Sequence, residues 1–110
     1  MINVTITRSH DGLIESFTMS GHAEFAEYGQ DIVCAAASAV SFGTVNAIEA
    51  LTGVVPEIEQ GGEGGFLRCV VPKELQKEID EKVQLLLEGM IVSLETIERD
   101  YGQYIKIKNI

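Results

Sequence analysis

The stretch GHAEFAEYGQDIVCAAASAVSFGTVNAIEALTG, from Gly21 to Gly53, decides how this chain is organised. It opens with a glycine and a histidine, His22, and continues through a short polar segment. Asp31 then precedes a long run of small and apolar residues, which predicts a helix from Ile32 to Thr52. Asp is a favourable N-cap and Gly a favourable residue after a helix end, so both boundaries of this helix are marked.

Alternating patterns on the N-terminal side of this stretch predict a hairpin. Apolar residues occupy every second position from Ile2 to Ile6, and Leu13 to Ser20 is the expected return strand. The Asp11-Gly12 pair between them favours a tight turn. The residues expected on the buried face of the return strand are Leu13, Phe17 and Met19, with Glu15 interrupting that face.

The C-terminal half predicts two more strands, a second helix and a last strand. The two strands span Pro56 to Val71 around a glycine-rich turn at Gly61–Gly65, and Cys69 in the second is expected to point into the core. We expect Pro72 at the first position of a long amphipathic helix, because proline is tolerated there. Tyr104–Ile110 alternates again as the final strand.

The order of elements predicts one α+β domain over residues 1–110. Strand, strand, helix, strand, strand, helix and strand favour a mixed β-sheet of about five strands with two helices packed on it. The chain has 110 residues, of which 45% are hydrophobic, so it is long and apolar enough to bury one core.

Charge and composition exclude several classes of function. Eight basic against 17 acidic residues give a formal net charge of −9, which repels phosphate backbones and favours basic partners. We therefore predict no direct nucleic-acid binding. The uncharged run from Ile32 to Ile48 is too short and polar for a comfortable membrane span, and the N-terminus does not resemble a signal peptide. We predict no membrane association, and two reduced thiols in a cytoplasmic protein.

His22 and Cys34 can form a catalytic pair. A thiol is a nucleophile as its thiolate, and the first turn of a helix stabilises negative charge. Cys34 is the third residue of the predicted helix, and an imidazole twelve residues earlier can take its proton. Two ordinary alternatives remain: Cys34 as one more small core residue of an alanine-rich helix, and His22 as a loop histidine without a chemical role.

Other residues near this pair have two interpretations each. Asp31 can cap the helix or orient His22, and capping is the commoner role. Ser38 lies one helical turn after Cys34, where it can donate a hydrogen bond to the sulfur or to a substrate, or serve as a small packing residue. The N–H groups of Cys34 and its neighbours are candidates for an oxyanion hole.

The polar segment between His22 and Asp31 is a candidate lid. Gly21 and Gly29 bracket it as possible hinges, and Glu24 and Glu27 can meet a basic or amino-terminal group of a substrate. A solvated surface loop is the default alternative. The histidines and cysteines lack metal-ligand spacing, so we predict neither a metal nor a cofactor.

Three segments together resemble one known family. Gly21-His22-Ala23, the Gly29–Ala36 segment GQDIVCAA and Ser38-Ala39 are similar to the ribosomal-processing cysteine protease family Prp, and the likeness extends over essentially the whole chain. The pattern is much more specific than a lone histidine and cysteine.

The resemblance implies a bacterial cytoplasmic endopeptidase that is a homodimer with a mobile loop. Its substrate would be a large-subunit ribosomal protein precursor, the twenty-seventh, whose short N-terminal extension is removed next to a pair of aromatic residues. By the motif, His22 would be the general base and Cys34 the nucleophile. Two rival classes are a non-catalytic ribosome-associated peptide-binding protein and a redox-sensing thiol, for which Cys69 would be the resolving partner.

Overall fold

The computed structural model describes residues 1–27, 30–61 and 65–110. Its elements are β1 (Ile2–Arg8), β2 (Ile14–Ser20), α1 (Ile32–Thr52), β3 (Glu57–Gln60), β4 (Phe66–Val70), α2 (Lys77–Tyr101) and β5 (Ile105–Asn109). The strands form a mixed sheet in the order β3-β4-β2-β1-β5, with β5 parallel to β1 and the other neighbours antiparallel. The predicted α+β fold, with five strands and two helices, is confirmed.

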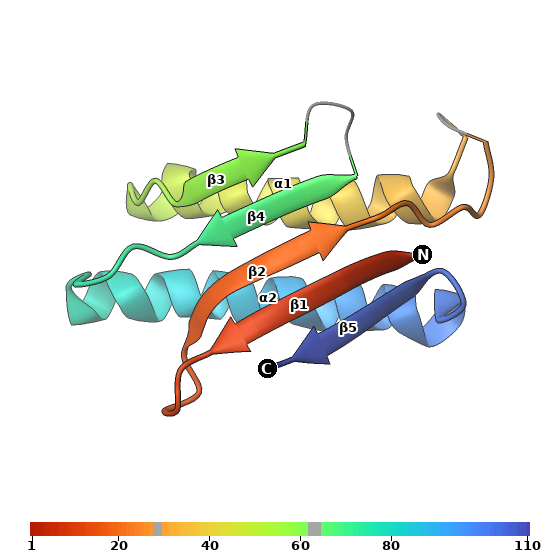
Figure 1. Ribbon diagram of the computed structural model, residues 1–110. Coiled ribbons are helices and arrows are strands. Elements are labelled where there is room, and N and C mark those ends of the chain that lie inside the picture. Colours follow the sequence, from red (N-terminus) through yellow and green to blue (C-terminus); the bar gives the residue numbers. More distant parts are fainter. Residues whose placement is uncertain (28–29, 62–64) are drawn as a thin grey trace.

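Both helices cover the same face of the sheet (Figure 1). Each helix connects two parallel strands: α1 leads from β2 over β4 to β3, and α2 leads from β4 over β2 and β1 to β5. Such crossovers are nearly always right-handed. The crossover from β2 runs toward the β3 edge of the sheet, and the crossover from β4 runs toward the β5 edge. Because β2 and β4 are also antiparallel, two right-handed crossovers place both helices on the same side of the sheet.

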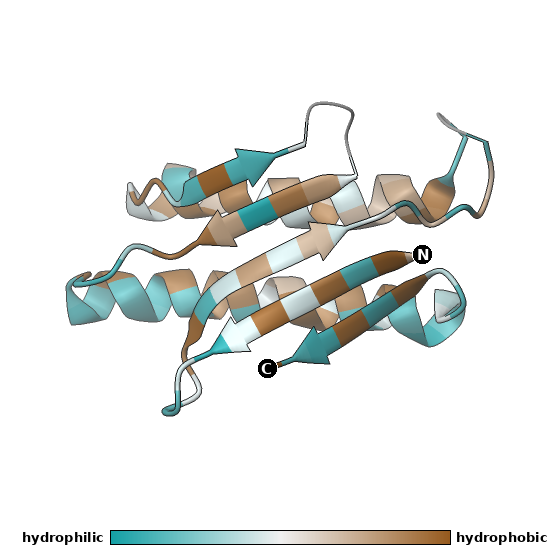
Figure 2. Cartoon of the chain, in the orientation of Figure 1, coloured by the Kyte–Doolittle hydropathy of each residue, from teal (hydrophilic) through white to brown (hydrophobic). Residues whose placement is uncertain are grey.

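The core lies between the sheet and the helices. Apolar and polar residues alternate along the strands (Figure 2), and the apolar side chains face the helices. Ile6, Leu87, Leu94 and Ile105 have no exposed side-chain surface. The buried residues of helix α1 are Val33, Ala37, Ser41 and Ile48. The many alanines, serines and the glycine of this helix let its backbone pack closely against α2.

By length and composition, α1 is also a helix that could cross a membrane. The core helices of soluble proteins meet the same criterion, and one inward-facing side of α1 is buried against the sheet. From the sequence, the run from Ile32 to Ile48 is expected to be too short and too polar for a span, whereas the whole helix meets this criterion. The absence of membrane association stays a prediction.

The predicted buried face of β2 is wrong at its first residue. Leu13 is exposed, and Ile14 is buried in its place. Arg8 pairs with Ile14 whereas Thr7 pairs with Ser16, so Glu15 is an extra residue in a β-bulge, and the alternation shifts by one position there. The side-chain amide of Gln84 on α2 accepts from the Ile14 N–H at 2.8 Å and donates to its carbonyl at 2.9 Å.

The predicted start of α2 is also wrong. The helix begins at Lys77 with Gln76 as its N-cap, so Pro72 is not its first residue. Glu74 has a φ of 65°, a left-handed conformation that a right-handed helix cannot continue through. The chain after β4 therefore forms a connector before it can become helical.

The bulge generates a prediction about stability. Gln84→Ala removes the partner of both backbone groups of Ile14, so we expect it to lower the free energy of unfolding by about 1–3 kcal/mol. Urea denaturation measures this difference. Lys82→Ala, at an exposed position on the same helix, is the control and should change stability by no more than about 0.5 kcal/mol. Equal losses in the two variants would contradict the role assigned to Gln84.

Candidate active site

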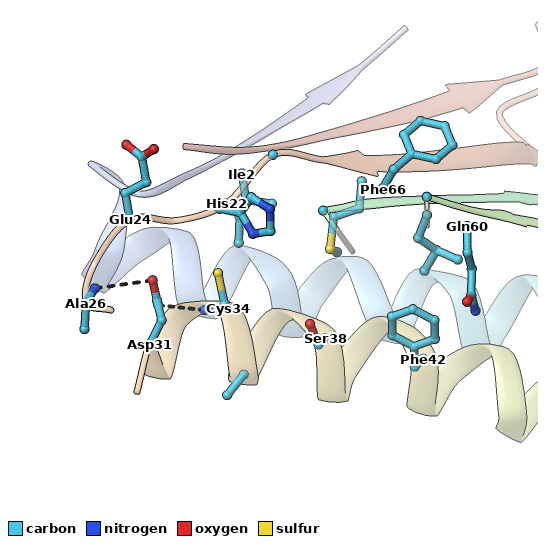
Figure 3. Close-up of a pocket in the computed structure, with 16 residues that line it drawn as sticks. Ile2, His22, Glu24, Ala26, Asp31, Cys34, Ser38, Phe42, Gln60 and Phe66 are labelled. Carbon is cyan, nitrogen blue, oxygen red and sulfur yellow. Dashed lines mark hydrogen bonds between the residues drawn. The ribbon is translucent and has the colours of Figure 1, made fainter. Parts of the chain in front are cut away.

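A cleft of about 650 Å³ opens where β2 ends and α1 begins. The first half of α1 forms one wall, and the segment after β2 together with the end of β3 and the start of β4 forms the other (Figure 3). The topology explains this position, because the end of β2, the start of α1, the end of β3 and the start of β4 all lie at the same end of the sheet.

Cys34 and His22 face each other across this cleft. Cys34 lies in the first turn of α1, is partly exposed, and its sulfur points toward the imidazole of His22 (Figure 3). The backbone N–H of Ala23 donates to Cys34 Sγ over 3.2 Å. The structure thus brings together the two residues that the sequence paired. Their roles as base and nucleophile stay predictions.

The imidazole of His22 lies directly over Gly65. A Cβ atom at position 65 would stand 2.6 Å from His22 Nε2, well inside the contact distance of any side chain. Gly65 also has a φ of 75°, and its carbonyl accepts a hydrogen bond from the Gly21 N–H over 2.8 Å. Only glycine fits both the backbone conformation and the space, so Gly65 is part of the seat of His22.

Asp31 is the N-cap of α1, as predicted. Its Oδ1 accepts from the N–H groups of Val33 and Cys34 over 3.0 and 2.9 Å. Its Oδ2 accepts from Phe25 and, at 3.4 Å, from Ala26. The carboxylate is buried and both oxygens are occupied by backbone donors, so in this structure Asp31 joins the helix start to the preceding segment and does not orient His22.

The pKa of Asp31 reflects this environment. Burial raises it, but the N–H donors of Cys34, Ala26, Phe25 and Val33 outweigh burial and hold the pKa of this carboxyl below its ordinary value. The same geometry corrects the expected oxyanion hole. The Cys34 N–H already donates to Asp31 and the Ala35 N–H to the Asp31 carbonyl, so these amides are engaged within the helix cap.

A stripe of residues along α1 lines the cleft beyond Cys34. Ser38 and Phe42 follow at intervals of four residues, with the phenyl ring of Phe42 pointing into the cleft beside Gln60 (Figure 3). Buried Met19 and Leu67 contribute from the sheet. The cleft beyond Cys34 therefore has a large apolar contribution from Phe42, Met19 and Leu67.

The other residues predicted for this site divide into three groups. Gly21 and Glu24 line the cleft, and both have positive φ values, 91° and 59°. Glu27 is exposed and outside the lining, where its carbonyl accepts from the Gln30 N–H. Gly29, the second predicted hinge, lies outside the described residues. Whether this segment moves as a lid stays a prediction.

Sequence patterns alone missed three participants. Ala23 acts through its backbone N–H, which carries no side-chain signal. From the sequence, Gly65 lies in a glycine-rich turn, and nothing in that pattern distinguishes it as a contact of His22. Phe25 was taken as part of a polar loop, yet its ring packs edge-on against Tyr101 and Tyr104, with centroids 5.7 and 5.1 Å away.

The second cysteine is structural. Cys69 has no exposed surface, and burial raises the pKa of its thiol to about 11, so it is protonated near neutral pH. This agrees with the prediction that it points into the core and disfavours a role as resolving thiol. Among residues 1–27, 30–61 and 65–110, no group of three His, Cys, Asp or Glu side chains could hold a metal ion.

Comparison with known proteins identifies the family. Residues 1–106 match the model of the family described as cysteine protease Prp. The chain belongs to this family. It is therefore a cysteine protease, which is a hydrolase, and the alternative of a non-catalytic peptide-binding protein is set aside.

Relatives and solved structures support the assignment to the Prp family. The ribosomal processing cysteine protease Prp of Bacillus subtilis is 54% identical over 107 residues, covering 97% of this chain and 96% of its own length. Two crystal structures of an essential ribosomal processing protease Prp from Staphylococcus aureus superpose over the full length of both chains. The complex with a covalently linked product peptide has a TM-score of 0.91 at 43% identity, and the complex with a substrate peptide 0.84 at 41%.

Gly65 provides a test of the site. Gly65→Ala should push the imidazole of His22 from its place and slow alkylation of Cys34 by iodoacetamide at least about tenfold near neutral pH, since the proton acceptor is displaced. Gly53→Ala is a matched control, because Gly53 has a φ of 76° but nothing within 4 Å of the added Cβ. Both variants carry the backbone strain, and only the first should lose reactivity. Equal reactivity in both would refute the seat assigned to His22.

Asp31 predicts a pH dependence of stability. Because its pKa is lower in the folded chain than in the unfolded one, its contribution is complete above the unfolded-state value, about 4, and is lost as the pH falls through the folded-state value. Asp31→Asn turns one acceptor into an NH2 group facing two N–H donors. It should cost about 1–3 kcal/mol near neutral pH, and less in acid.

Chemical denaturation at neutral and acid pH measures the difference between Asp31→Asn and the unsubstituted protein. Asp100→Asn, at an exposed position near the end of α2, controls for the change of charge. A stability difference that stays constant from neutral to acid pH would show that the Asp31 carboxylate does not titrate with folding.

Proposed function

We propose that this protein is a cytoplasmic endopeptidase that removes the short N-terminal extension of a large-subunit ribosomal protein, the twenty-seventh, during ribosome maturation. The observation that carries the proposal is the placement of Cys34 opposite His22 in a cleft that continues along α1. The Staphylococcus aureus relative with its covalently linked product peptide supports covalent catalysis by this family.

In the proposed mechanism Cys34 is the nucleophile and His22 the acid and base. His22 takes the thiol proton, and the Cys34 thiolate forms a bond to the scissile carbonyl carbon. The C–N bond then breaks, and His22 gives its proton to the leaving amine. Water, deprotonated by His22, attacks the resulting thioester. The new carboxylate leaves, and the Cys34 sulfur returns to its starting state.

The remaining groups near Cys34 have supporting roles in this proposal. The first-turn amides are engaged by Asp31, so α1 contributes through its macrodipole, whose positive end lies at the cleft. Ser38, one turn further along the same face, is the proposed hydrogen-bond donor to the bound peptide backbone. Glu24 at the rim can attract a basic residue of the substrate.

Charge and exposed surface support the proposed partners. A net charge of −9 favours a basic ribosomal protein precursor and disfavours direct contact with nucleic acid. Leu85 and Val92 on α2 are 73% and 62% exposed, which supports a homodimer that would cover them. We further propose that the protein needs no cofactor and does not associate with a membrane.

The test is cleavage of the extended precursor, followed by mass spectrometry of the intact products. The unsubstituted protein should generate one new N-terminus in the precursor, and Cys34→Ala should leave the precursor whole while keeping its fold by circular dichroism. Cleavage by Cys34→Ala would refute the nucleophile. An intact precursor with both proteins, under conditions where a shorter generic peptide is cut, would refute the substrate but not the protease.

A further inference from the structure

The direct hydrogen-bond donors near the Cys34 sulfur decide how its thiolate is stabilised. The first turn of α1 is the expected source, but Val33 and Cys34 donate to Asp31 Oδ1. The Asp31 carboxylate also places a negative charge at this helix end, which opposes a second one on the sulfur. The donor that reaches Sγ is the N–H of Ala23, over 3.2 Å.

This contact discriminates between the two states of the sulfur. A neutral thiol is a weak acceptor, whereas a thiolate accepts hydrogen bonds strongly. Ala23 is 2% exposed, so its N–H has little access to water as an alternative partner. A buried N–H aimed at Sγ is therefore satisfied best when Cys34 is ionised.

The position of the Ala23 N–H is fixed by its neighbours. Two residues later, the Phe25 N–H donates to Asp31 Oδ2 over 2.9 Å. The ring of Phe25 packs edge-on between Tyr101 at the end of α2 and Tyr104 before β5. The segment from 23 to 26 is thus held both at the start of α1 and at the end of α2, which lie at the same end of the sheet, and the N–H arrives at Sγ already oriented.

We propose that the backbone N–H of Ala23 stabilises the thiolate of Cys34, and that Phe25 is the positioning residue that holds it there. The proposal rests on the proposed role of Cys34 as nucleophile. It gives Asp31 an indirect part: its Oδ2 holds the Phe25 backbone, which compensates for the adverse effect of its charge on the sulfur. The Ala23 N–H keeps its own proton and only donates a hydrogen bond, while the proton of Cys34 passes to His22.

The test removes one hydrogen-bond donor without changing a side chain. Replacing Ala23 by the corresponding α-hydroxy acid converts its amide to an ester, which has no N–H. The same replacement at Ala50, an exposed position near the end of α1, controls for incorporation and for the cost of a lost backbone hydrogen bond. Alkylation of Cys34 by iodoacetamide is measured in short pulses from about pH 5 to 9 by mass spectrometry of the Cys34 peptide.

The Ala23 ester should react about tenfold more slowly near neutral pH and approach the unsubstituted rate at high pH, because only the thiolate fraction changes. The Ala50 ester should behave like the unsubstituted protein. Phe25→Leu, which keeps an apolar side chain but loses both ring contacts, should shift the pH midpoint in the same direction by a smaller amount.

Three results would overturn the proposal. They are an unchanged midpoint in the Ala23 ester, an equal slowing at every pH, which indicates altered access, and an equal shift of the midpoint in the Ala50 ester, which indicates a general effect of the ester. Alkylation needs no substrate, so these results are read independently of whether the proposed ribosomal precursor is cleaved.

Discussion

The carboxylate of Asp31 connects the two parts of the chain on which the site depends. One oxygen holds the first turn of α1, and with it Cys34, while the other holds the backbone at Phe25 and Ala26. A single ionised group thereby fixes the start of α1 relative to the segment that precedes it in the chain. Four N–H donors outweigh burial and lower the pKa of this carboxyl, which favours its ionised form.

The topology of the sheet brings together the segments that form the site. Two crossovers leave both helices on one face of the sheet. The end of β2, the start of α1, the end of β3 and the start of β4 all lie at one end of that sheet. His22 follows β2 by two residues and rests on Gly65, which precedes β4. The site is therefore built from three chain segments that the sheet brings together: the segment after β2, the start of α1 and the segment before β4. The backbone of these segments positions each side chain of the site.

The elements and the Cys34–His22 pair were predictable from sequence, because they depend on local signals: alternation in the strands, Asp31 before a run of small residues, and Gly53 after it. Three features were not predictable. At the bulge of Glu15, the backbone of Ile14 is bonded by Gln84, which lies far along the chain. The conformation of Glu74, not the position of Pro72, sets where α2 begins. The contact of the Ala23 N–H with the Cys34 sulfur and the contact of Gly65 with His22 arise from tertiary packing, which residue types alone do not predict.

Cys34, Ser38 and Phe42 lie along the cleft at a regular spacing that can be compared with the length of a bound peptide. Successive positions on this face of α1 are separated by about 6 Å along the helix axis, whereas an extended peptide advances about 3.3 Å per residue. A peptide lying along α1 would pass one of these side chains about every two residues and reach Phe42 about four residues from the bond at Cys34. Under the proposed function, the regular repeat of the helix would relate the cleavage position to the distance between the scissile bond and an apolar residue of the substrate.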